Sequence, residues 1–208
     1  CRVVAAVGRK RTVADDSPGH GRTMVLAGVP GDELIECDAV DAHANSVAAM
    51  SSEHGFSPNT DELLLNNASY AETFADGHLS VEPRRRLAVV ACMDSRMNIF
   101  EMLGLQHGEA HIIRNAGGVI PDDVIRSLCL SQRFLGTREI ILLHHTNCGL
   151  NQVSEDEFKA SIEAELGIKP WWALESFTDP FTDTRQSINR LQHSPFVPYK
   201  DHIRGFVY

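Results

Sequence analysis

Two apolar runs in this chain each lead directly into side chains that can bind a metal ion. The run 87–91 (LAVVA) precedes Cys92, and the run 140–143 (IILL) precedes a segment that contains His145 and Cys148. Unbroken apolar runs of this length are typical of strands buried on both faces, as in a parallel sheet. Because ligand-binding groups gather at the carboxyl ends of such strands, we expect these three side chains to lie close together.

Two cysteines and one histidine form a set that suits zinc. Three protein ligands leave one coordination position open, which distinguishes a catalytic zinc site from a structural one. Cys92 alone is more simply interpreted as a small buried hydrophobe, and an isolated His-x-x-Cys pair is a weak signal. The combination is more specific, because Asp94 and Arg96 occupy alternate positions after Cys92. We therefore predict that Cys92, His145 and Cys148 bind Zn²⁺.

Asp94 and Arg96 suit a role beside such a metal. Zinc lowers the pKa of a bound water toward neutrality, so a hydroxide nucleophile is available at physiological pH. The Asp94 carboxylate can accept a hydrogen bond from that hydroxide, and Arg96 can hold the carboxylate ionised through two parallel hydrogen bonds. Backbone N–H groups near Gly149 can stabilise charge that develops on the substrate. The simpler alternative is an Asp–Arg ion pair that caps the following helix.

These motifs resemble those of the β-class carbonic anhydrases. That family carries a Cys-x-Asp-x-Arg motif after one strand and a His-x-x-Cys motif after a later one, as residues 92–96 and 145–148 do here. The connecting segment 113–118 (IRNAGG) is also similar. The likeness extends from about Asn66 to the C-terminus, and it is greatest to a bacterial subgroup of mycobacterial type.

The resemblance implies a fold, a reaction and an assembly. The fold would be α/β, with a mainly parallel central β-sheet flanked by helices. The reaction would be the reversible hydration of carbon dioxide to bicarbonate and a proton, by attack of zinc-bound hydroxide, with Asp94 and Arg96 as the catalytic pair. In some members the aspartate moves onto the metal as a fourth ligand, and the sequence leaves that open here. The family builds its active sites at a dimer interface, so a homodimer or homotetramer is expected.

Two other functions stay open. Enzymes that hydrolyse carbonyl sulfide or carbon disulfide are similar to this family and share its zinc ligands, so the shape of the pocket would have to separate them. A non-catalytic zinc protein is the alternative from a different class. The lack of a fourth Cys or His in the two motifs, together with the Asp94–Arg96 pair, argues against it.

The composition limits the classes of partner that the chain is expected to bind. The net charge of −9 argues against a general nucleic-acid binder, which needs a basic face for phosphates. No apolar run approaches transmembrane length, so no membrane partner is expected. The five cysteines are an odd number spread along 208 residues, which is unlike a disulfide framework. We therefore expect zinc thiolates in a reducing, cytoplasmic compartment.

The chain divides into an extension and a domain. Residues 1–57 are rich in Ala, Gly, Asp and Ser, and are predicted to be a flexible N-terminal extension. The sequence starts with Cys1, and Met24 and Met50 are both possible initiators, so whether residues 1–49 belong to the natural protein stays open. Residues 58–208 are predicted to form the zinc-dependent domain, with a last strand that is cut off at the C-terminus.

Strand and helix signals alternate along this domain. Strands are predicted at 87–91, 110–113, 139–143 and 204–208. Helices are predicted from about residue 59, at 99–103, from Pro121 to before Gly136, from the capping box at Ser154 to Leu166, and at 181–192. Such alternation predicts an α/β fold. Strand alternation places His144 opposite His145, so His144 is predicted to be a core residue or a support for the metal ligands.

Overall fold

The computed structural model describes residues 58–208, and the predicted extension over residues 1–57 lies outside the described part. The described residues belong to two compact units that divide between His78 and Leu79. The first unit contributes helix α2 (Thr60–Thr73) and the short 3-10 helix η1 (Asp76–His78). The second unit contains every other described element and both motifs that are predicted to bind metal.

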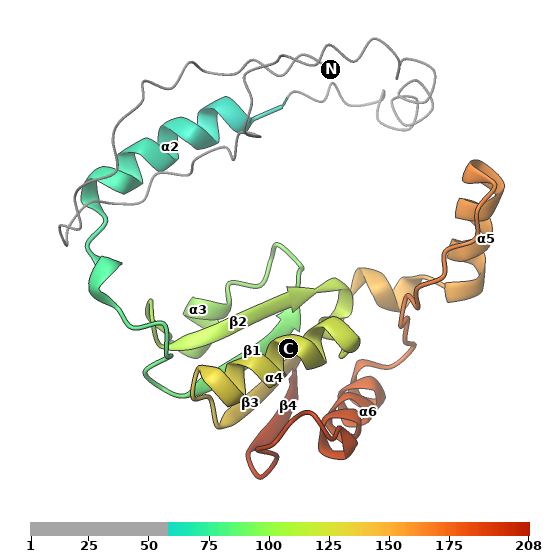
Figure 1. The fold of residues 1–208 in the computed structure, drawn as a ribbon. Coiled ribbons are helices and arrows are strands. Elements are labelled where there is room, and N and C mark those ends of the chain that lie inside the picture. Colours follow the sequence, from blue (N-terminus) through green and yellow to red (C-terminus); the bar gives the residue numbers. More distant parts are fainter. Residues whose placement is uncertain (1–57) are drawn as a thin grey trace, which may run out of the picture. The chain divides into compact units, whose positions relative to one another are not determined.

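The second unit is built on one four-stranded sheet (Figure 1). Its strands are β1 (Leu87–Cys92), β2 (Ala110–Asn115), β3 (Glu139–His144) and β4 (Ile203–Val207). Its helices are α3 (Ile99–Leu103), η2 (Ala116–Gly118), α4 (Asp122–Phe134), η3 (Gly149–Gln152), α5 (Glu155–Leu166) and α6 (Pro180–His193). The strand order is β2-β1-β3-β4, and all three neighbouring pairs are parallel. The predicted α/β fold with a parallel sheet is confirmed.

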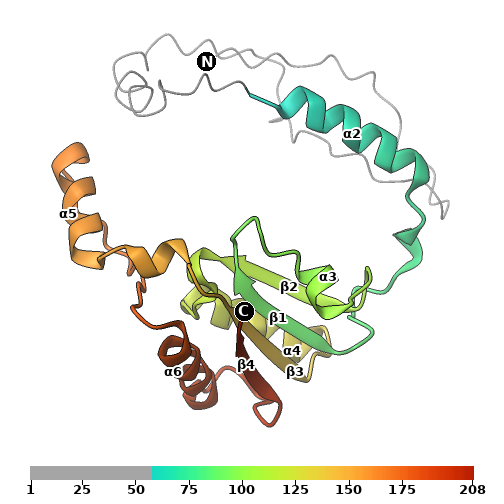
Figure 2. The same ribbon diagram turned by 180° about the vertical axis from the view of Figure 1, so that it is seen from behind.

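Helices cover both faces of the sheet, which explains the unbroken apolar runs. Val89 on β1 packs in the same apolar cluster as Ile99 of α3. Its neighbour Val90 points to the other face and packs in a second cluster with Leu128 of α4. Figures 1 and 2 show α4 and α3 on opposite sides of the sheet. A strand buried on both faces needs apolar residues at every position, because successive side chains alternate between the faces.

The order of the strands creates a crevice at the carboxyl ends of β1 and β3. After β1 the chain moves to β2 at one edge, and it then crosses to β3 on the other side of β1. The segments that follow β1 and β3 therefore leave the sheet toward opposite sides, and ligands bind at such a point in open α/β sheets. The register pairs Ala91 with Leu143, so Cys92 and His145 emerge from the sheet next to each other.

Local signals determine most element boundaries. Helix α5 begins after Ser154, whose hydroxyl accepts a hydrogen bond from the Glu157 backbone N–H, as the capping box predicts. Strand β2 runs two residues further than predicted, because the polar residues Arg114 and Asn115 still pair with Ala91 and with Cys92.

Among residues 58–208, no helix is both long enough and apolar enough to cross a membrane.

Candidate metal centre

The structure brings the three predicted metal ligands together. Cys92 is the last residue of β1, His145 directly follows β3, and Cys148 directly precedes η3. All three residues are buried, and one ligand atom from each lies within 4.8 Å of the others. The two sulfur atoms are 3.8 Å apart. The site therefore depends on the pairing of β1 with β3, which carry ligands that are distant in sequence.

His145 presents a free nitrogen to this cluster. Its Nδ1 lies 2.8 Å from the Thr146 carbonyl oxygen, which can only accept a hydrogen bond. Nδ1 therefore carries the proton in the neutral ring, and the lone pair is left on Nε2. Nε2 is buried and has no hydrogen-bond partner within the described residues. A buried polar atom without a partner is unfavourable, and a metal ion at this position would satisfy it.

The thiols of Cys92 and Cys148 are also suited to binding a cation. Burial raises the pKa of Cys148, and the neighbouring Cys92 sulfur raises it further, although backbone N–H groups of Leu150 and Asn151 act in the opposite direction. Two adjacent buried thiolates are therefore unfavourable unless a positive charge lies between them. Two thiolates with one imidazole are a donor set that zinc prefers, so the residues fit Zn²⁺.

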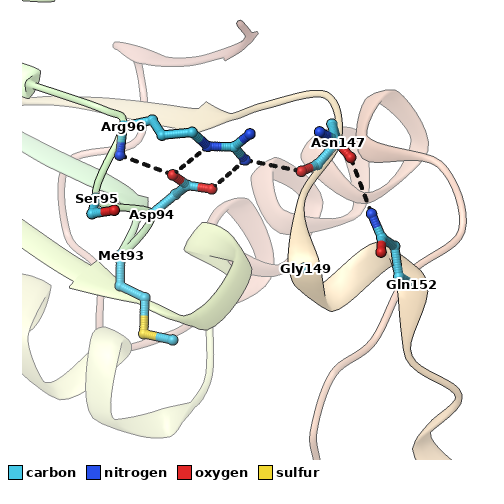
Figure 3. A pocket seen from close by; sticks show the side chains of 7 residues that line it. All are labelled: Met93, Asp94, Ser95, Arg96, Asn147, Gly149 and Gln152. Carbon is cyan, nitrogen blue, oxygen red and sulfur yellow. Dashed lines mark hydrogen bonds and ion pairs between the residues drawn. The ribbon is translucent and has the colours of Figure 1, made fainter. Parts of the chain in front are cut away.

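Arg96 holds the Asp94 carboxylate through several hydrogen bonds (Figure 3). The Arg96 side chain donates from Nε to Oδ1 at 2.8 Å and from Nη2 to Oδ2 at 2.6 Å, and its backbone N–H also donates to Oδ1 at 2.9 Å. These bonds keep the pKa of Asp94 well below its usual range and raise the pKa of Arg96. Asp94 is therefore ionised at neutral pH, with Oδ2 3.7 Å from Nε2 of His145.

Asn147 connects the two motifs, and sequence reasoning did not identify it. Its carbonyl oxygen accepts a hydrogen bond from Nη2 of Arg96 at 3.1 Å, and its side-chain oxygen accepts one from Gln152 at 3.0 Å (Figure 3). Its φ of 53° lies in the left-handed region, which asparagine tolerates better than most residues. An asparagine between two ligands is the signal in the sequence that indicates this turn.

Two cavities open beside the metal-binding cluster. The larger, of about 620 Å³, is lined by Met93, Asp94, Ser95, Arg96, Asn147, Gly149 and Gln152. The smaller, of about 260 Å³, is lined by Asp94, Arg96, Met97, His145, Thr146, Asn147 and Tyr208. The predicted substrate-side residue Gly149 thus lies in the same cavity as the Asp94–Arg96 pair. A side-chain carbon added at Gly149 would meet no atom within 4 Å, so space is available there.

His144 lies outside this cluster. It is fully buried, and its Nε2 is 2.6 Å from Oδ2 of Asp183 on α6. Its ring also packs against Phe177, at 5.6 Å between ring centres. The prediction of a core residue agrees with this burial, and the contact with Asp183 ties the end of β3 to α6.

Comparison with known proteins identifies relatives with this architecture. The sequence model of the family described as carbonic anhydrase matches residues 87–194. Beta-carbonic anhydrase 1 of Mycobacterium tuberculosis is 53% identical over 149 residues, which cover 72% of this chain and 91% of that protein. The crystal structure of carbonic anhydrase from Streptococcus mutans superposes with a TM-score of 0.69 at 39% identity, covering 74% of this chain and 93% of that one. A carbon disulfide hydrolase of Acidianus is 49% identical over 86 residues, which cover 41% of this chain and 42% of that protein.

Proposed function

The chain belongs to the β-carbonic anhydrase family, and we infer that it catalyses the reversible hydration of carbon dioxide to bicarbonate and a proton. It is accordingly a lyase. The observation that carries this function is the meeting of two buried thiols and an unpartnered imidazole nitrogen beside an arginine-held carboxylate.

We propose that Cys92, His145 and Cys148 hold a zinc ion as the cofactor. When bound there, zinc supplies the Lewis acidity that makes water a nucleophile near neutral pH. The free Nε2 of His145 and the close pair of sulfur atoms support this assignment. The Nδ1–H bond to the Thr146 carbonyl fixes the ring so that Nε2 faces the sulfur atoms.

We propose that Asp94 and Arg96 orient the attacking water. Because Arg96 keeps Asp94 ionised, the carboxylate can only accept hydrogen bonds, so it accepts one from the attacking water and directs the oxygen lone pair toward carbon dioxide. The two hydrogen bonds from Arg96 support an arrangement in which Asp94 stays off the metal. The backbone N–H of Gly149, at the start of η3, is the proposed donor to an oxygen atom of the product.

Hydrolysis of carbon disulfide is the second candidate, because relatives with that activity match part of the chain. The two activities are distinguished by stopped-flow measurement of carbon dioxide hydration and of sulfide release from carbon disulfide, on protein with a measured zinc content. We expect carbon dioxide hydration that is abolished by a zinc-binding anion. Sulfide release without carbon dioxide hydration would instead assign the second activity.

We propose that the protein self-associates as a homodimer or homotetramer. Large apolar side chains are exposed in the second unit, among them Trp171 at 92%, Phe134 at 75% and Phe196 at 60%. Exposed apolar surface of this kind is typical of a protein–protein interface. Sedimentation velocity should show a species of two or four chains, and a monomer at micromolar concentration would contradict the proposal.

We also propose a cytoplasmic location. Cys92, Cys129 and Cys148 are free thiols in the described part of the chain, and metal-binding thiolates persist in reducing compartments. Cell fractionation would test this directly, and recovery of the protein from an oxidising compartment would contradict it.

A further inference from the structure

Arg114 makes two contacts that neither the metal ligands nor the Asp94–Arg96 pair explains. It lies near the end of β2, and its side chain reaches the segment that follows β1. Its Nε donates to the carbonyl oxygen of Cys92 at 2.9 Å, and its Nη2 donates to the carbonyl oxygen of Asp94 at 2.6 Å. We propose that Arg114 is a positioning residue for the hydration reaction, which fixes the backbone from Cys92 to Asp94 and thereby the direction of the Asp94 carboxylate.

The geometry of the guanidinium group suits this task. The two carbonyl groups belong to Cys92 and Asp94, the residues on either side of Met93, so one planar group holds the peptide units 92–93 and 94–95. Hydrogen bonds from a charged donor are stronger than those between neutral groups, and the guanidinium plane is rigid. Met93 itself donates its backbone N–H to the Asn115 carbonyl at 2.8 Å. The segment is therefore attached to the end of β2 at three successive residues.

Arg96 cannot provide this attachment alone. It lies two residues from Asp94 in the same segment, and the hydrogen bond that it donates outside this segment goes to Asn147 in the turn after β3, not to a strand of the sheet. Arg114 belongs to a different element, and β2 pairs with β1 along six residues. Arg96 thus holds the carboxylate of Asp94, whereas Arg114 holds the carbonyl of the same residue relative to the sheet.

Arg114 acts through Asp94 and not on the substrate. It lines neither of the two cavities beside the metal-binding cluster, whereas Asp94 lines both. Among the described residues, its hydrogen bonds go to neutral carbonyl groups. The inference rests on the proposed hydration of carbon dioxide, because its consequence is the placement of a group that orients water.

The test is a double-mutant cycle between Arg114→Ala and Asp94→Ala on the zinc-loaded full chain. A displacement of about 1 Å at a reacting group can cost up to about 100-fold in rate, so we expect Arg114→Ala to lower kcat/KM by about 10- to 100-fold. In the Asp94→Ala background the same change should lower it by less than about twofold, because residues that act through one another are not additive. Arg126→Ala is the matched control, since within residues 58–208 Arg126 pairs only with Asp123 on the surface of α4, and it should leave kcat/KM unchanged.

Two further measurements separate positioning from folding. Arg114→Lys keeps the charge but cannot donate to both carbonyls in one plane, so an intermediate loss of kcat/KM is expected with zinc content unchanged. Hydrogen–deuterium exchange of the peptide 92–98 should be faster in Arg114→Ala than in the wild type and in Arg126→Ala. This exchange measurement does not depend on catalysis.

Each contrary outcome overturns the proposal in a recognisable way. Equal losses of kcat/KM in both backgrounds, or no loss in either, would show that Arg114 does not act through Asp94. Unfolding or loss of zinc in both Arg114 variants, but not in Arg126→Ala, would assign Arg114 a purely structural role. If the wild type does not hydrate carbon dioxide, the proposed function fails, and exchange at 92–98 alone decides whether Arg114 fixes the segment.

Discussion

Replacing Gly118 with alanine should destabilise the sheet at the metal-binding end. Gly118 has a φ of +73°, and a side-chain carbon there would lie 2.9 Å from the Cys92 backbone nitrogen and 3.1 Å from the Leu143 carbonyl oxygen. The left-handed conformation costs an L-residue about 1–2 kcal/mol. Contact with backbone atoms that cannot rotate away adds about 1–3 kcal/mol. We therefore expect a loss of about 2–5 kcal/mol in the free energy of unfolding.

Gly167→Ala is the matched control for this change. Gly167 has a φ of +72°, but an added carbon there would meet no atom within 4 Å. It should therefore show only the conformational cost of about 1–2 kcal/mol. Urea unfolding of both variants, with the slope of each transition compared, measures the difference. Equal losses in the two variants would refute the argument that β1 and β3 leave no room at Gly118.

Cys148→Ser should abolish stoichiometric zinc and activity together, and a chelator should lower the melting temperature of the wild type but not of this variant; a variant that keeps one zinc per chain would contradict the assignment. Asp94→Asn should retain zinc but lose about 100-fold in kcat, as for a group that orients the attacking water; wild-type turnover would remove Asp94 from the mechanism. Glu109 is buried beside Arg84 and Arg85, and hydrogen bonds from Arg84, the Gln106 backbone and Arg85 lower its pKa from 4.5 to about 2. The ionised form of Glu109 therefore stabilises the fold above pH 4.5, and the greater free energy of unfolding of the wild type relative to Glu109→Gln should disappear as the pH falls from 4.5 toward 2. A difference in urea stability that does not change with pH would contradict this.

Much of the fold follows from patterns within short segments. The apolar runs predict β1 and β3 because both faces of these strands are covered, and Ser154 with Glu157 predicts where α5 begins. The motifs that follow the two runs predict the metal-binding cluster, because carboxyl ends of parallel strands lie at one edge of a sheet. What the patterns do not contain is the strand order, which decides that β1 and β3 are neighbours.

The contacts that hold the site together were not predictable in this way. Arg114 and Arg96 donate to backbone carbonyl groups of Cys92, Asp94 and Asn147, over separations of 20 to 51 residues. Every residue offers a carbonyl group, so no residue type in the sequence indicates the acceptor. The motifs show which side chains carry the chemistry and that Arg96 can hold the Asp94 carboxylate, whereas the hydrogen bonds to distant backbone carbonyl groups appear only in the folded chain.

The proposed metal ligands are divided between the end of β1 and the segment that follows β3, and this division links metal binding to folding. Cys92 belongs to one segment, and His145 with Cys148 belongs to another, so neither segment alone supplies three ligands. Arg96 connects these two segments, because it donates hydrogen bonds to the Asp94 carboxylate in the first and to the Asn147 carbonyl oxygen in the second. The pairing of β1 with β3 therefore brings the three proposed ligands together and places the Asp94–Arg96 pair beside them. A metal that binds only this assembled state stabilises the pairing in return, by mass action.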